Sequence, residues 1–144
     1  MNDESVRSYT ESPVVTTTTR VVVPFALTYG VYVVLHGADS PGGGFQGGAI
    51  AASTLIMVAF GFGVEPTARW LNFDFALALA VVGVLGFMFA ALASVALGHA
   101  ALALDVLPLA MKYAIEAIEI AIGAVVTGVV TLLFMVMATP REET

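Results

Sequence analysis

The sequence contains no cysteine and few charged residues. The lack of cysteine excludes disulfides, thiolate metal sites and a cysteine nucleophile. Only 11% of the 144 residues are charged, whereas a soluble domain carries about 25%. Because so few charges cannot cover a globular surface, and because 59% of the residues are hydrophobic, the composition indicates an integral membrane protein.

Basic residues and histidines are also scarce. Five Lys and Arg stand against 11 Asp and Glu, for a net charge of −6. This balance argues against a nucleic-acid surface and against a polybasic lipid-binding patch. The two histidines, His36 and His99, lie far apart and predict no metal site. No nucleophile–base–acid arrangement is present, so we predict that the chain is not an enzyme.

Four long apolar segments follow one another along the chain. They cover residues 17–36, 45–63, 73–98 and 107–138. A helix needs about 20 residues to span a bilayer, so each segment is long enough. We therefore predict an all-α membrane protein with four transmembrane helices. The chain divides into a polar tail (1–16), a four-helix domain (17–138) and an acidic tail (139–144).

Several residues mark expected helix ends. Pro24 would sit in the first turns of the first helix, where proline is tolerated. Asn72 would cap the third helix. Asp105 is a plausible cap for the fourth helix, with Pro108 in its first turn. Residues 64–72 are expected to form a loop.

The distribution of basic residues predicts the orientation in the membrane. Arg7, Arg20, Arg69 and Arg141 all fall on the side of the two termini, and only Lys112 falls near the opposite side. Cytoplasmic loops carry an excess of Lys and Arg. We therefore predict that both termini are cytoplasmic and that the first and third connections face outward.

A glycine-rich turn, residues 36–48, separates the first two apolar segments. Its glycines and proline cannot continue a helix without a large cost, so the chain must turn here. A phosphate-binding loop is not indicated, because the Gly-Lys-Ser/Thr ending is absent. The spacings Gly43 to Gly47 and Gly44 to Gly48 instead predict close helix packing at the start of the second helix.

The fourth segment contains the most informative ionisable residues. Lys112, Glu116 and Glu119 are three or four positions apart and share one helix face. The same face continues with Gly123, Thr127 and Thr131. If the helix enters the membrane near residue 107, Glu119 lies well inside the hydrocarbon layer, where a carboxylate costs about 2.5–3.5 kcal/mol. We therefore expect this face to contact protein.

Two interpretations of these residues remain open. Glu116, Glu119 and Lys112 could form part of a path that passes H⁺ or coordinates Na⁺, with His36 as a further candidate. Alternatively, Lys112 and Glu116 form a structural ion pair, and Glu119 is protonated or interfacial. His36 at a helix C-terminus is explained by the helix dipole, and Asp39 could pair with it or cap the turn.

The turn also carries a family resemblance. Leu35-His36-Gly37 is followed by Ser40, Pro41, Gly42, Gly43, Gly44, Phe45, Gln46, Gly47 and Gly48. This segment resembles the signature of the MnhB/MrpB family, small subunits of multisubunit Mrp-type Na⁺/H⁺ antiporters. Relatives of the family occur in the membrane arm of energy-converting hydrogenases. The resemblance covers roughly residues 20–138.

The resemblance implies a subunit of a Na⁺/H⁺ antiporter in the cell membrane, supporting sodium extrusion and pH homeostasis. It implies partners: large antiporter subunits related to the proton-pumping subunits of respiratory complex I, and several small membrane subunits. It implies no organic cofactor, only transported Na⁺ and H⁺. The alternatives are a membrane-arm subunit of a hydrogenase-type complex, a structural subunit without an ion path, or an independent small pore or receptor.

Overall fold

The computed structural model describes residues 12–39, 42–107 and 109–138, and the regular structure within them is helical. The elements are α2 (Pro13–Leu35), α3 (Gly44–Phe62), α4 (Val64–Trp70), α5 (Phe73–Ala96), the 3₁₀ helix η1 (Leu104–Val106) and α6 (Met111–Ala138). In this part of the chain, four helices, α2, α3, α5 and α6, are long and apolar enough to cross a membrane. The prediction of an all-α protein with four membrane helices is confirmed.

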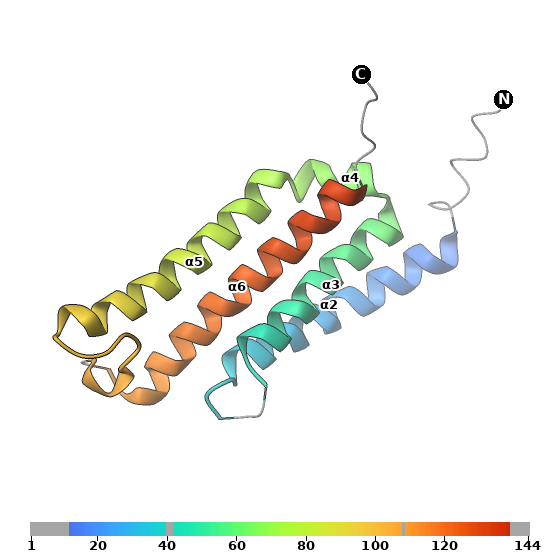
Figure 1. The fold of residues 1–144 in the computed structure, drawn as a ribbon. Helices are drawn as coiled ribbons and strands as arrows, with labels where there is room; N and C mark the ends of the chain where they lie inside the picture. The colour runs from blue at the N-terminus through green and yellow to red at the C-terminus, as the bar shows by residue number, and fades with distance from the viewer. Residues whose placement is uncertain (1–11, 40–41, 108, 139–144) are drawn as a thin grey trace, which may run out of the picture.

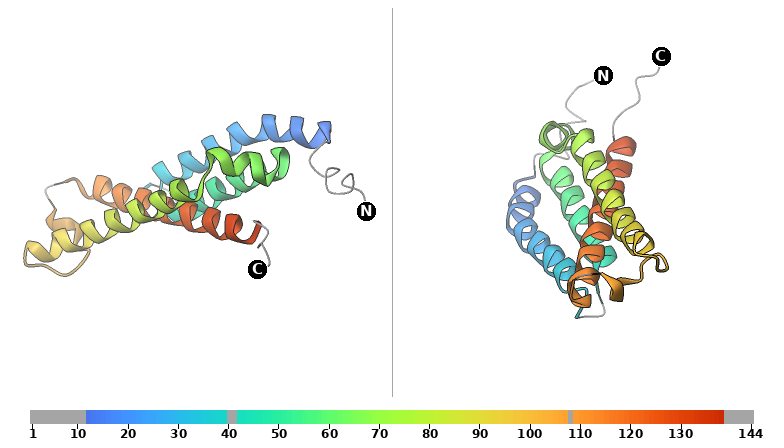
Figure 2. Two further views of the ribbon diagram at one scale, coloured as in Figure 1. Left: turned by 90° about the horizontal axis from the view of Figure 1, so that it is seen from above. Right: turned by 90° about the vertical axis from the view of Figure 1, so that its left-hand side faces the viewer.

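The four long helices lie in a row in the order α2, α3, α6, α5 (Figures 1 and 2). The glycine-rich turn and the α5–α6 connection lie at one end of this row. The short helix α4, the first residue of α2 and the last residue of α6 lie at the other end. The end of α2 and the start of α6 therefore both lie near the glycine-rich turn.

The helices approach one another through glycine and alanine. A Cβ atom on Gly48 of α3 would lie 2.7 Å from the carbonyl oxygen of Gly123 in α6. A Cβ on Gly128 of α6 would lie 2.6 Å from the carbonyl oxygen of Ala76 in α5. Small residues let helix backbones pack closely in a membrane, where dispersion rather than the hydrophobic effect holds them together. The close packing predicted from the Gly-x-x-x-Gly spacing is confirmed.

The first helix begins earlier than predicted. It starts at Pro13, so residues 13–16, which the sequence assigned to the tail, are helical. Pro13 provides the favoured first-turn proline, and Pro24 consequently lies inside the helix rather than in its first turns. Thr16 is fixed because its hydroxyl donates to the carbonyl oxygen of Gly61 at the end of α3 (3.1 Å).

The predicted loop at residues 64–72 is also wrong, because α4 occupies most of it. Gly63 has φ +96°, a conformation that glycine adopts without strain, and this ends α3. The helix then restarts, and the Thr67 hydroxyl donates to the carbonyl oxygen of Gly63 (2.7 Å). Arg69 and Glu65 form an exposed ion pair one turn apart (3.4 Å).

The remaining helix-end predictions have mixed outcomes. The Asn72 cap is confirmed, since its Oδ1 accepts from the N–H of Phe75 (2.8 Å). The Asp105 cap is wrong: Asp105 lies in η1, and α6 starts only at Met111. Pro108 lies outside the described residues. The fourth membrane helix is therefore preceded by a short irregular segment that the sequence analysis counted as helix.

The orientation can be tested by cysteine labelling, because the chain has no cysteine of its own. His99 in the α5–α6 connection and Glu65 in α4 are exposed and lie at opposite ends of the row. We expect an impermeant maleimide to label His99→Cys in intact cells and Glu65→Cys only after permeabilisation, as the arginine distribution predicts. The reverse labelling pattern would contradict a cytoplasmic location of the termini.

The close α3–α6 contact generates a second prediction. Gly48→Ala would drive its Cβ into the α6 backbone, whereas Gly86→Ala on α5 would place its Cβ 3.5 Å from the Ala121 Cβ, an ordinary contact. Both changes replace a glycine inside a helix by alanine, so both variants gain the same helix propensity, and this gain cancels in the comparison. We expect Gly48→Ala to destabilise by about 1–3 kcal/mol and Gly86→Ala to be neutral or stabilising, measured as thermal unfolding in mild detergent. Equal melting temperatures would show that the helices are not tightly packed.

Candidate functional site at the glycine-rich turn

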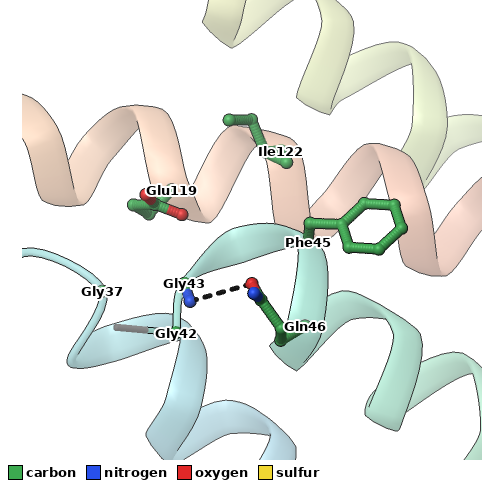
Figure 3. A pocket seen from close by; sticks show the side chains of 7 residues that line it. All are labelled: Gly37, Gly42, Gly43, Phe45, Gln46, Glu119 and Ile122. Carbon is green, nitrogen blue, oxygen red and sulfur yellow. Dashed lines mark hydrogen bonds between the residues drawn. The ribbon is translucent and has the colours of Figure 1, made fainter. Parts of the chain in front are cut away.

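The carboxylate of Glu119 lies at the N-terminus of α3. The N–H of Gly44 donates to Glu119 Oε2, and the N–H of Gly43 donates to Gln46 Oε1 (3.2 Å). The first N–H groups of a helix have no partner within the helix, and the positive end of the helix dipole favours a negative charge. Glu119 therefore fastens the start of α3 to α6 (Figure 3).

The glycines of the turn make room for this carboxylate. A Cβ on Gly43 would lie 2.5 Å from Glu119 Cδ, and one on Gly37 would lie 2.9 Å from Glu119 Cγ. A Cβ on Gly44 would lie 2.9 Å from the Cβ of Ile122. A Cβ on Gly44 would also meet the backbone carbonyl of Glu119, so glycine is required there, whereas a Cβ on Gly37 or Gly43 would displace the Glu119 side chain. The turn and Glu119 form one unit of structure.

An open cavity of about 310 Å³ lies beside this contact. Its lining residues are Gly37, Gly42, Gly43, Phe45, Gln46, Glu119 and Ile122. Figure 3 shows Glu119 on the α6 side of the cavity and Gln46 on the α3 side. Carboxylate and amide oxygens are the ligands that hard cations prefer. The wall of the cavity thus offers oxygen atoms that could receive a cation or water.

Lys112 at the start of α6 pairs with Asp39 of the turn. The two side chains are 58% and 53% exposed, so the pair lies at the surface of the site. This arrangement differs from the predicted structural pair of Lys112 with Glu116, because Glu116 acts on Lys112 only as a nearby charge. Within the described part of the chain, no salt bridge to Glu116 is present.

The predicted site residues gather at one end of the bundle. His36 caps the C-terminus of α2 and its ring stacks on Tyr32, with 4.2 Å between the ring centroids. Lys112, Glu116 and Glu119 lie in the first three turns of α6, and Lys112 and Glu119 contact residues of the glycine-rich turn. Ser40 and Pro41 of the signature segment lie outside the described residues. Sequence reasoning did not identify the Lys112–Asp39 pair, although opposite charges flanking the turn could have indicated it.

The rest of the polar face of α6 is buried against protein, as expected. Gly123, Thr127 and Thr131 are all buried, and Thr131 is only 1% exposed. The Thr127 hydroxyl lies 2.7 Å from the carbonyl oxygen of Gly123 and 3.2 Å from that of Gly48 on α3. Beyond Glu119 this face is thus tightly packed, and the accessible polar groups are confined to the turn end.

The helix lengths revise the expected depth of the carboxylates. Helix α3 has 19 residues, or about 28 Å at 1.5 Å per residue, which nearly equals the hydrocarbon thickness of about 30 Å. Its first residue, Gly44, must therefore lie near one boundary of this layer. Glu119 contacts Gly44 and lies at the same level, and Glu116 lies about one turn further out. The helix lengths therefore predict Glu119 near the boundary, whereas entry of the helix near residue 107 predicted it well inside the layer.

Comparison with known proteins places these features in a family. A family model described as "Domain related to MnhB subunit of Na+/H+ antiporter" matches residues 14–139. This range includes all four membrane helices and the whole glycine-rich turn. The match therefore covers the part of the chain that builds the candidate site.

Individual relatives match over a shorter range. Proteins of Staphylococcus aureus strains Newman, JH1 and COL, each named "Putative antiporter subunit mnhB2", are 42% identical to this chain over 72 residues. The match covers 50% of this chain and 50% of each relative. The matched region thus spans about half the length of these curated relatives.

The Glu119 contact predicts a measurable loss of stability. Glu119→Ala removes the acceptor of the Gly44 N–H and the charge at the α3 N-terminus, so we expect a destabilisation of about 1–2 kcal/mol, as for the loss of a helix cap. Glu65→Ala is the control, because Glu65 is 85% exposed and, among the described residues, pairs only with exposed Arg69. Thermal unfolding of the purified protein in mild detergent measures both. Indistinguishable melting temperatures would contradict the fastening role of Glu119.

Proposed function

The chain belongs to the family of domains related to the MnhB subunit of Na⁺/H⁺ antiporters, and we propose that it is a small membrane subunit of a multisubunit antiporter. Its four apolar helices make it a multi-pass protein of the cell membrane. The complex would exchange Na⁺ for H⁺ across the membrane. The family match over residues 14–139 is the observation that carries this proposal.

In this proposal the chain does not act alone. Its partners are large antiporter subunits related to the proton-pumping subunits of complex I, together with other small membrane subunits. It serves as a transporter component without enzymatic chemistry or an organic cofactor. The relatives are named as antiporter subunits, which favours this assignment over a hydrogenase-type membrane arm.

The two carboxylates of α6 take different roles in the proposal. Glu119 is engaged by Gly44, and we assign it the task of holding the turn against α6. Glu116 lies one turn further out, is half-buried, and has no ion pair among the described residues. A carboxylate near the membrane boundary without a fixed counter-ion can attract a cation. Glu116 is therefore our first candidate for the ion path.

His36 and Lys112 are assigned supporting roles. The ammonium group of Lys112 pairs with Asp39. Its positive charge therefore lies at the entrance of the site and does not form a salt bridge with Glu116. His36 is placed by its stacking on Tyr32 at the end of α2. Both residues would shape the electrostatic field at the entrance, and Glu116 would carry the contact with the ion.

The complex itself is tested by purification from native membranes. We expect a tagged chain extracted in mild detergent to carry large antiporter subunits and other small membrane proteins with it, identified by mass spectrometry. Recovery of nickel–iron and iron–sulfur hydrogenase subunits would instead support the alternative complex. Recovery of the chain alone, with selective ion flux after reconstitution, would support an independent pore.

The role of Glu116 is tested by Glu116→Gln in the complete complex. Removing its charge should weaken cation attraction, so we expect the Na⁺ concentration for half-maximal antiport to rise severalfold while the subunit composition stays unchanged. Glu65→Gln at the other end of the row is the matched control. Antiport is measured in everted vesicles from cells without other Na⁺/H⁺ antiporters. Wild-type Na⁺ dependence in Glu116→Gln would remove Glu116 from the ion path.

A further inference from the structure

One outer face of α2 carries aromatic side chains in a continuous stripe. Phe25, Tyr29, Tyr32 and His36 are spaced at i, i+4, i+7 and i+11, so they share one side of the helix. Phe25 is 73% exposed, Tyr29 58% and Tyr32 53%. The opposite side of α2 packs against α3, where Gly30 is buried. We call these four residues the α2 aromatic stripe.

The other outer helix of the row, α5, has a different surface. Beyond its first turn, its exposed side chains have no hydrogen-bonding group, as at Val82, Leu85 and Phe89. Such a surface suits contact with lipid acyl chains. The α2 aromatic stripe adds two phenol hydroxyls to an otherwise similar apolar surface, so the two outer helices are not equivalent.

The position of Tyr29 argues against anchoring at the lipid headgroups. Tyr29 lies six residues before Leu35, the last residue of α2, which is about 9 Å along the helix. Side chains on a helix lean toward its N-terminus, and the N-terminus of α2 lies at the opposite end of the row. The phenol of Tyr29 therefore leans toward the middle of the bilayer rather than toward the nearer headgroups.

The Tyr29 hydroxyl needs a hydrogen-bond partner at this depth. Among the residues that the structure describes, no hydrogen bond to the hydroxyl of Tyr29 or Tyr32 is present. Acyl chains offer no acceptor, and a hydroxyl without a partner in an apolar medium is costly. By contrast, the neighbouring Thr28 donates to the Pro24 carbonyl oxygen of its own helix (2.7 Å).

We propose that the α2 aromatic stripe is the docking face for a transmembrane helix of another subunit. This helix presents oxygen acceptors, either side-chain or backbone carbonyl, opposite Tyr29 and Tyr32. The inference rests on the proposed function, since it requires a multisubunit complex. It goes further by assigning the interface to α2 and leaving the outer face of α5 to lipid.

Site-specific photocrosslinking in the assembled complex tests the assignment. A photoreactive phenylalanine derivative replaces Tyr29 in one variant and Phe89 in the other, and the complex is irradiated in native membranes. We expect a crosslink from position 29 to one other membrane protein and no protein crosslink from position 89. A crosslink between two copies of this chain, or none from position 29 while other subunits still co-purify, overturns this inference and leaves the proposed function intact. If no subunit co-purifies, both fail.

Removal of the two hydroxyls tests the hydrogen bonds themselves. Tyr29→Phe combined with Tyr32→Phe keeps both rings, so helix packing is preserved, and Tyr113→Phe on α6 is the matched control. Membrane hydrogen bonds average about 0.6 kcal/mol, so we expect the double variant to retain about three- to tenfold less partner in detergent. Unchanged retention would overturn the role of the hydroxyls, since a purely apolar contact would not respond to this substitution.

Discussion

The contact between Glu119 and the N–H of Gly44, the first residue of α3, governs the arrangement of the glycine-rich turn against α6. A membrane helix that begins near the hydrocarbon boundary has free N–H groups where water is limited. In this chain an acidic side chain from α6 supplies the acceptor for Gly44. That contact fixes the level of α3 relative to α6, and glycine is required at Gly44 and Gly48, where a Cβ would meet the α6 backbone. The turn sequence and the acidic residue 75 positions later are therefore parts of one constraint.

This constraint also explains how the charges at the turn end are distributed. Lys112 lies at the start of α6 and reaches Asp39, which lies on the turn that Glu119 holds in place. Two contacts therefore bind the turn to α6: the exposed Lys112–Asp39 ion pair and the partly buried hydrogen bond from Gly44 to Glu119. Because Lys112 already pairs with Asp39 and the start of α3 with Glu119, Glu116 has no salt bridge among the described residues and interacts with Lys112 only as a nearby charge.

Much of this arrangement could be predicted from local sequence features. Apolar length alone identified the four membrane helices, and Asn72 was found because a cap acts on residues three positions away. The glycine-rich turn was located because glycine and proline are local signals. What failed depended on contacts distant in sequence or on competing local signals. Gly63 adopts a positive φ, so α3 ends there and a second helix can start at residue 64. The length and composition of the segment do not indicate this change of direction. Glu119, the partner of the turn, could not be identified because it lies 75 positions later on another helix, and no local pattern links the two.

The row of helices has a consequence for assembly. A four-helix bundle closed on itself buries its polar groups internally, whereas a row leaves both outer helices uncovered. Here the buried Thr127 hydroxyl lies within hydrogen-bond distance of the Gly123 and Gly48 carbonyl oxygens, so this contact between α3 and α6 is complete within one chain. The phenols of Tyr29 and Tyr32 on α2 are exposed instead. Since acyl chains offer a phenol no acceptor, the outer face of α2 is incomplete within one chain, which is the pattern expected of a subunit rather than of an isolated protein.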